Sequence, residues 1–136
     1  MKEIIDTATW KAIAQHGDEA TQEFYRRLKD KRLCSTRCDS CSQIAYPPRS
    51  FCPFCHSAKV SWVELPKRAR LYAFTHQHRS LRFPAPEPIG LVEVEGVGHF
   101  LSRIDAPLEE LKIGQELEVS FFEVTPDLWL HQYRPV

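Results

Sequence analysis

The first apolar pattern along the chain has the period of a helix. Ala20, Phe24 and Leu28 are spaced by four residues, which puts them on one face of an α-helix. Asp18 stands where an N-cap residue is expected, and basic residues gather toward the other end, where cations suit the helix dipole. We therefore predict a helix that begins after Asp18 and ends near residue 31. Its apolar face must pack on the rest of the chain or on a partner.

After residue 58 the pattern changes to the period of two that is typical of strands. Val92 and Val94, for example, alternate with Glu93 and Glu95. Six segments have a β-rich composition, and most of them alternate: 60–65, 69–75, 89–95, 99–104, 116–124 and 128–134. A weaker helical pattern covers residues 7–15.

The connections between these segments carry turn and loop signals. Residues 95–98, "EGVG", predict a tight hairpin, and the proline-rich residues 82–88 predict an extended loop. Residues 105–114 predict a short helix that Asp105 caps and Gly114 ends.

The predicted strands are short, and one small helix precedes the last two strands. This arrangement favours a small closed barrel over a sandwich. The predicted fold is mainly β with an N-terminal helical segment, a zinc ribbon and an OB-fold barrel, and an SH3-like barrel is the alternative. We place the domains at 1–33, 34–58 and 59–136.

The densest chemical signal is "CDSCSQIAYPPRSFCPFC", residues 38–55. Two Cys-x-x-Cys pairs with ten residues between them can place four thiolates in a tetrahedron, which is the closed geometry of a structural zinc site. The predicted ligands are Cys38, Cys41, Cys52 and Cys55. Iron also suits four thiolates, and a disulfide or redox pair is the less favoured interpretation.

Two details depart from the commonest pattern of such turns. Glycine usually follows the second cysteine of each pair, but Ser42 and His56 stand at these positions. Cys34 is a fifth thiol without the required spacing, and we expect it to be a small buried or helix-end residue.

A site closed by four thiolates leaves no position for water or substrate, so we expect a structural metal. The metal would hold the segment between the pairs as a rigid loop. Tyr46, Arg49 and Phe51 are then either preorganised contact residues or the side chains that pack the ribbon against the barrel.

The net charge of the chain is zero, but the charges are segregated. Residues 26–82 hold 13 basic against 3 acidic side chains, whereas residues 83–136 hold 3 basic against 10 acidic ones. A positive segment can attract phosphates, nucleic acid or an acidic protein face, unless the acidic part of the same chain folds onto it. The start of the chain has no secretory pattern and no stretch could span a bilayer, so we expect a cytoplasmic protein.

No catalytic motif emerges from the remaining polar residues. Candidates are His76, His78, His99, His131, Glu93, Glu95 and Asp105. The first two histidines could face one side of a strand and bind a metal, but a third ligand at a convincing spacing is missing. With no nucleophile elbow and no phosphate-binding glycine loop, the sequence does not support an enzyme that acts alone.

These motifs together resemble those of one family. "RCDSC", "YPPR" and "CPFC", followed by "LYAFTHQHR", "PIGLVEVEG", "LEELKIGQELEV" and "YRPV", resemble the acyl-CoA-associated family that joins a rubredoxin-like zinc ribbon to an OB-fold. The resemblance covers residues 18–136. It implies an accessory subunit, usually without an active site, that accompanies thiolases, related acyltransferases and aldolases, or hydratases.

The resemblance further implies that the chain docks on a thiolase-type or related acyl-CoA enzyme and helps to hold a CoA thioester. The predicted docking residues are Phe24, Leu28, Tyr46 and Arg49, and from charge and loop position the predicted CoA contacts are Arg79 and Arg82.

The alternative is a protein that binds single-stranded nucleic acid, because both modules can do so with aromatic residues beside basic ones. Tyr72 and Phe74 share a predicted strand face, near Arg70, Arg79 and Arg82. The zero net charge and the acidic second half of the barrel make nucleic acid an unfavoured partner.

Overall fold

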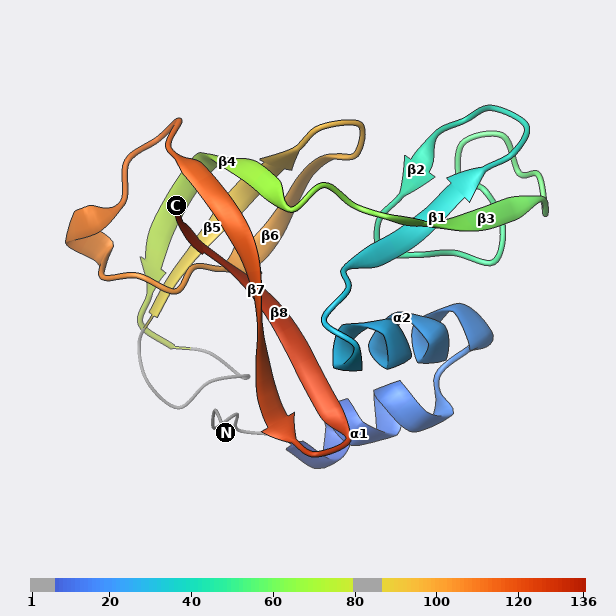
Figure 1. Cartoon of the computed structure of the whole chain (residues 1–136), viewed down its shortest axis with the longest axis horizontal. Coiled ribbons are helices and arrows are strands. Elements are labelled where there is room, and N and C mark those ends of the chain that lie inside the picture. The colour runs from blue at the N-terminus through green and yellow to red at the C-terminus, as the bar shows by residue number, and fades with distance from the viewer. Residues whose placement is uncertain (1–6, 80–86) are drawn as a thin grey trace.

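The computed structural model describes residues 7–79 and 87–136, and it has a ribbon, a barrel and two helices (Figure 1). The elements in chain order are α1 (Thr7–His16), α2 (Glu19–Lys29), β1 (Cys34–Cys38), β2 (Ile44–Ala45), β3 (Val60–Glu64), β4 (Arg68–Gln77), β5 (Glu87–Val94), β6 (Gly98–Arg103), η1 (Leu108–Glu110), β7 (Glu116–Thr125) and β8 (Leu128–Pro135). Arg82 and most of the predicted proline-rich loop lie outside the described residues.

Helix α2 forms as its sequence predicts. The Asp18 carboxylate accepts a hydrogen bond from the backbone N–H of Thr21 at 2.8 Å, which caps the first turn. The apolar stripe Ala20, Phe24 and Leu28 is buried, and it packs on strand β8 and on the main core. The chain itself therefore covers this face of the helix.

The ribbon is a three-stranded antiparallel sheet with the order β2-β1-β3. The register runs from Cys34 opposite Glu64 to Cys38 opposite Val60. The sequence pattern predicts the strand over 60–65 as part of the barrel, but this pairing places it in the sheet of the ribbon. The reason is that β3 returns from the second cysteine pair directly alongside the strand that leads into the first.

The barrel is a curled five-stranded antiparallel sheet with the order β6-β5-β4-β7-β8. Its two edge strands approach each other where Ile104 forms a parallel bridge with Tyr133, and the N–H of Asp105 donates to the carbonyl of Tyr133 at 2.8 Å. Elsewhere β6 and β8 remain separate, so the sheet is a half-closed barrel. The predicted OB-fold is confirmed, and its core gathers Leu71, Val92, Val94, Ile104, Leu117 and Tyr133.

The β7–β8 hairpin extends beyond the barrel and reaches the helices (Figure 1). Val124, Leu128 and Leu130 form a second small core there, against Trp10 and Tyr25. The end of the chain thus supplies the surface on which the first two helices pack.

The predicted helix over 105–114 is reduced to the three-residue 3₁₀ turn η1. Pro107 precedes it in an extended conformation, with φ −60° and ψ 144°, and makes no side-chain cap. Asp105 does not cap a helix, because its carboxylate accepts from the side-chain amide of Gln132 at 3.3 Å. Gly114 has a φ of +88° and turns the chain toward β7, as its position predicted.

No helix within the described residues is long and apolar enough to cross a membrane.

Leu28→Ala is expected to lower the free energy of unfolding by about 2–5 kcal/mol, because the side chain is completely buried and its loss leaves a cavity. Ile113→Ala is the control, since that side chain is 71% exposed and its change should stay within about 0.5 kcal/mol. Urea titrations of the two variants measure both values. Equal losses of unfolding free energy in the two variants would contradict the burial of Leu28 in the core.

Candidate functional site

The four cysteines of the two pairs converge at one end of the ribbon. Their sulfur atoms all lie within 4.8 Å of one another, with 3.5 Å between Cys38 and Cys55 and 3.6 Å between Cys41 and Cys52. A tetrahedral zinc ion with Zn–S bonds of about 2.3 Å places its sulfurs about 3.8 Å apart. The donor set and its spacing therefore fit a single structural zinc ion.

Each pair forms a tight turn whose backbone N–H groups point at the first sulfur. The N–H groups of Ser40 and Cys41 donate to Cys38 Sγ, both at 3.3 Å. In the second turn, the N–H groups of Phe54 and Cys55 donate to Cys52 Sγ at 3.4 and 3.5 Å. The two turns repeat the same geometry on opposite sides of the metal position.

The residue after each turn adopts the left-handed conformation. Ser42 has a φ of 66° and His56 a φ of 67°, and both donate their N–H to the carbonyl of the turn's first cysteine at 2.9 Å. This is the conformation for which glycine is usual. Both turns therefore form without glycine at these positions, but Ser42 and His56 carry backbone strain.

The backbone N–H groups that point at Cys38 and Cys52 favour the thiolate form of the first cysteine in each pair. The N–H of Cys41 lowers the pKa of the Cys38 thiol to about 6, against the opposing effect of burial. For Cys52, burial raises the pKa, but the N–H groups of Cys55 and Phe54 outweigh it and the net shift is downward.

At Cys41 and Cys55 the backbone N–H groups of Gln43 and Ser57 also lower the pKa, but burial and the neighbouring thiols outweigh them and the net shift is upward. Zinc, when bound, would hold the two turns together, and its four thiolate ligands leave no open coordination position.

Cys34 lies outside this cluster. It is buried at the start of β1, and the Arg27 guanidinium donates to its sulfur at 3.8 Å. The guanidinium also lies 4.9 Å from the centre of the Trp62 ring. Its position is that of a packed cysteine between helix and ribbon.

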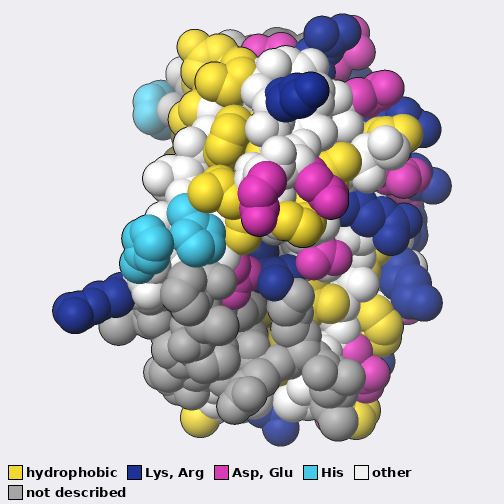
Figure 2. Space-filling model, turned by 90° about the vertical axis from the view of Figure 1, so that its left-hand side faces the viewer, with side chains coloured by type: hydrophobic (Ala, Val, Ile, Leu, Met, Phe, Trp, Pro, Cys, Tyr) yellow, Lys and Arg dark blue, Asp and Glu magenta, His cyan; other side chains and the backbone are white. Residues whose placement is uncertain are grey.

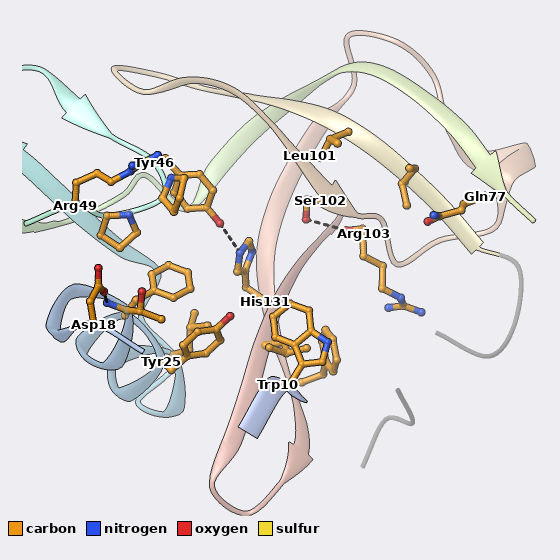
Figure 3. Close-up of a pocket in the computed structure, with 18 residues that line it drawn as sticks. Trp10, Asp18, Tyr25, Tyr46, Arg49, Gln77, Leu101, Ser102, Arg103 and His131 are labelled. Atoms are coloured by element: carbon orange, nitrogen blue, oxygen red, sulfur yellow. Dashed lines mark hydrogen bonds between the residues drawn. The ribbon is translucent and has the colours of Figure 1, made fainter. Parts of the chain in front are cut away.

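Tyr46 joins the ribbon loop to the barrel (Figure 3). Its ring stacks on Phe100 of β6 with centroids 4.1 Å apart, and its hydroxyl shares a 2.8 Å hydrogen bond with His131 Nε2 of β8. Phe24 of α2 lies against both rings, at 6.2 Å from each. Tyr46 thus occupies the junction of helix, ribbon and barrel.

His131 is held neutral at this junction. Burial lowers its pKa to about 4, and its Nδ1 atom is buried with no hydrogen-bond partner within the described part of the chain. Sequence reasoning considered His131 only as a catalytic candidate. Its contact with Tyr46 bridges 85 positions, and neither residue belongs to a motif that predicts it.

A groove of about 760 Å³ opens beside this junction, between the ribbon loop, the helices and the half-closed barrel (Figure 3). Arg49 and Asp18 lie at one end of it, and Arg103 and Gln77 at the other. Arg103 forms an ion pair with Glu87 and a hydrogen bond to Gln132, so its charge is compensated.

The predicted docking residues have different environments. Phe24 and Leu28 belong to the core, and Tyr46 is half-buried in the junction. Arg49 is exposed, and its backbone N–H donates to Thr36 Oγ1 at 3.0 Å. On the same ribbon, Phe51 is 48% exposed, and Phe54, which the sequence did not single out, is 55% exposed.

The other predicted polar residues do not converge. His76 and His78 lie with their ring centroids 4.7 Å apart, but the four cysteines are the one group of three or more metal-type ligands that the described residues form. His99 Nε2 lies 2.9 Å from Glu93 on the barrel surface, and Glu95 lies in the exposed hairpin turn. Asp105 belongs to the Gln132 contact described above. Arg79 is exposed just after β4.

The predicted aromatic platform on β4 does not form. A β-bulge between Leu71 and Ala73 breaks the alternation, so Tyr72 is exposed and stacks on His99, whereas Phe74 packs against the core. Arg70 is paired in register with Glu93. Figure 2 shows acidic and basic side chains interspersed among apolar ones on the described surface of the side that lies on the left in Figure 1.

Two family models match consecutive parts of the chain. Residues 27–61 match the rubredoxin-like zinc ribbon domain of ChsH2, and residues 62–122 match the C-terminal OB-fold domain of ChsH2. The chain is also 27% identical over 115 residues to a probable enoyl-CoA hydratase alpha subunit of Thermomonospora curvata. That alignment covers 82% of this chain but 36% of the relative, so the chain spans about a third of the length of this relative.

Two solved structures share the fold. The Ltp2-ChsH2(DUF35) aldolase matches with a TM-score of 0.76 and 24% identity, over 87% of this chain and 95% of the matched chain. A protein of the DUF35 family with unknown function from Sulfolobus solfataricus matches with a TM-score of 0.63 and 20% identity, over 94% of each chain.

Ser42→Gly and His56→Gly are each expected to raise the free energy of unfolding of the zinc-loaded protein by about 0.5–1 kcal/mol, because glycine adopts a positive φ without steric cost. Ser50→Gly, outside the positive-φ positions, should instead lower it by about 0.4–1 kcal/mol. Chemical unfolding with zinc analysis checks both, and about one zinc per chain should persist. A loss of stability in both turn variants would contradict the strain described for these positions.

Acid is expected to destabilise the protein through His131. The unfolded chain binds the proton near pH 6.5 and the folded chain near pH 4, so the free energy of unfolding falls as the pH drops through this window and is unaffected above it. Between about pH 7.5 and 5.5 the loss should be about 1 kcal/mol.

His131→Phe is the matched variant for this measurement, since it keeps a ring beside Phe24 but cannot titrate. The thiolate ligands contribute equally to the pH dependence of both proteins, so the difference between them isolates His131. The same slope in wild type and variant would show that His131 does not titrate as described.

Proposed function

Because this chain carries both ChsH2 domains and so belongs to the family that joins a rubredoxin-like zinc ribbon to an OB-fold, we propose that it is an accessory subunit of an acyl-CoA enzyme. In this role it docks on a thiolase-type enzyme, or a related aldolase or hydratase, and supports it without catalysing a reaction of its own. It also helps to hold the CoA thioester at the partner's active site.

The observation that carries this proposal is the match of both domains, in the same order, to one protein family. The matched proteins with a named activity support it, since one is called an aldolase and the other an enoyl-CoA hydratase subunit. The name of the hydratase subunit includes an acyl-CoA, and both names describe assemblies or subunits rather than a small chain acting alone.

The chemistry of the metal centre supports a structural role in the complex. Four thiolate ligands fill a tetrahedral coordination sphere, so zinc held there neither activates water nor polarises a substrate. The ion instead fixes the loop between the two turns, and this loop carries Tyr46 into the junction and presents Arg49 and Phe51 at the surface. We assign the docking function to this ordered surface.

The docking face consists of Arg49, Phe51 and Phe54 on the ribbon. Exposed aromatic side chains with an arginine beside them are the residue types that contribute most to protein interfaces. Phe24, Leu28 and Tyr46 support this face from below, because they hold helix and ribbon on the barrel. The partner surface would be apolar, with an acidic group opposite Arg49.

Arg79 and Arg82 are proposed to contact the phosphates of CoA. Arg79 is exposed at the end of β4, on the barrel rather than on the docking face, and Arg82 follows it closely in the sequence. Guanidinium groups bind phosphate oxygens in pairs of hydrogen bonds, which suits the nucleotide end of CoA.

Phe51→Asp combined with Phe54→Asp is expected to reduce binding to the partner enzyme at least ~30-fold, in line with the loss of one strong aromatic contact. The native chain is purified from its own cells with its partner, the partner is identified by mass, and its turnover of an acyl-CoA thioester is assayed. Affinity is then measured by calorimetry with the separated components.

Ile113→Asp is the control, since Ile113 is an exposed apolar residue of the barrel, away from the ribbon. Metal content must stay at about one zinc per chain in every variant, as one four-thiolate site requires. Recovery of the chain with oligonucleotides, and without an acyl-CoA enzyme, would overturn the proposal in favour of the nucleic-acid alternative. Iron in place of zinc would overturn the metal assignment.

A further inference from the structure

Two histidines lie together at the end of β4, on the side of the barrel that is opposite the ribbon (Figure 1). His76 is half-buried near the end of this strand, and His78, which directly follows the strand, is exposed. Their ring centroids are 4.7 Å apart, and the ring planes meet at 81°. Figure 2 shows two histidine side chains side by side on the surface, in keeping with this distance.

The imidazole nitrogens of this pair are available to a ligand. Within residues 7–79 and 87–136, His76 and His78 contact each other and make no hydrogen bond or ion pair. The residue opposite His76 in the sheet is Pro88, which has no polar side chain. The other barrel histidines differ, since His99 pairs with Glu93 and His131 bonds to Tyr46.

The spacing of the two rings is that of imidazoles bound to one ion. A divalent transition ion bonds imidazole nitrogens at about 2.0–2.1 Å, so two such rings have their centres about 4.5–5.2 Å apart when the angle at the ion is about 90–110°. The observed 4.7 Å lies within this range. The angle between the ring planes is not restricted, because each ring can rotate about its bond to the ion.

The surrounding charges do not attract a cation, so the ring nitrogens must supply the affinity. Gln77 is in register with Glu87, but this carboxylate is paired with Arg103. Arg79 follows His78 and is exposed, and its positive charge opposes a cation. Neutral imidazole is a good ligand for Zn²⁺, Cu²⁺ and Ni²⁺, whereas Mg²⁺ and Ca²⁺ require oxygen ligands.

We propose that His76 and His78 together bind one divalent transition ion of the class of Zn²⁺, Cu²⁺ and Ni²⁺, with water at its remaining coordination positions. This site differs from the four-thiolate centre in chemistry, because two protein ligands leave the ion open to solvent and to exchange. Two imidazoles hold an ion more weakly than four thiolates do, so the ion leaves during gel filtration while the structural zinc stays. The proposal does not rest on the accessory role or on a partner enzyme.

Ni²⁺ is the probe, titrated calorimetrically into the zinc-loaded full chain without an affinity tag. We expect saturable binding of about one Ni²⁺ per chain, with His76→Gln and His78→Gln each weakening the affinity at least ~10-fold because each removes one of two ligands. His99→Gln is the matched control, since this exposed histidine of the same barrel stands outside the pair, and it should bind as the wild type does. Mg²⁺ should give no binding.

Two further measurements locate the bound Ni²⁺. The paramagnetic ion should broaden the ring signals of His76 and His78 in NMR spectra and leave those of His99 sharp, and zinc analysis should find the structural zinc still bound. Release of zinc in step with nickel uptake would place the ion at the thiolates instead. That result, a loss in only one of the two histidine variants, an equal loss in His99→Gln, or no saturation at millimolar Ni²⁺ would overturn the proposal, whether or not the chain binds a partner enzyme.

Discussion

The four-thiolate centre is the constraint on which the ribbon, and through it the rest of the surface, depends. About 30 residues between the helices and the barrel bury too little apolar area to fold by themselves, and a bound metal supplies the missing free energy, on the order of 10 kcal/mol. Both cysteine turns are completed by residues with a positive φ, Ser42 and His56, whose backbone conformation is strained. The backbone N–H groups of these turns then stabilise the thiolates that hold the ion.

A metal orders the ribbon, but it does not orient the ribbon relative to the barrel. Tyr46 does so, because its ring stacks on Phe100 and its hydroxyl reaches His131. The apolar face of α2 fills the space beneath through Phe24. Helix, ribbon and barrel therefore meet at a single aromatic junction, and both the proposed docking face and the groove are defined by the angle that this junction sets.

The sequence predicted the parts of this molecule that depend on local patterns. The stripe of α2, the paired cysteines and most strands follow from spacing within a few residues. It could not predict contacts between distant positions that carry no motif, such as Tyr46 with His131 or the open seam between β6 and β8. Alternation alone does not show an extra residue in a strand, so the sequence could not predict the bulge at Tyr72. A short strand does not reveal its partner, so the sequence could not show that β3 pairs with the ribbon strand β1. The cysteine spacing identified the metal ligands, whereas the groove arises from three elements that each look ordinary alone.

The β7–β8 hairpin has a consequence for how the chain acquires this structure during synthesis. Leu128 and Leu130 pack with Trp10 and Tyr25, so the surface that the first helices need is translated more than a hundred residues after Trp10. While the chain grows on the ribosome, the ribbon can close around its metal as soon as β3 has emerged, but the helices cannot dock until the last strand is released. Contacts of such long sequence separation slow folding and leave apolar surface exposed in the meantime. A nascent chain would then be an ordered metal ribbon with an undocked amphipathic helix ahead of it, and shielding this helix falls to chaperones or to a partner already present.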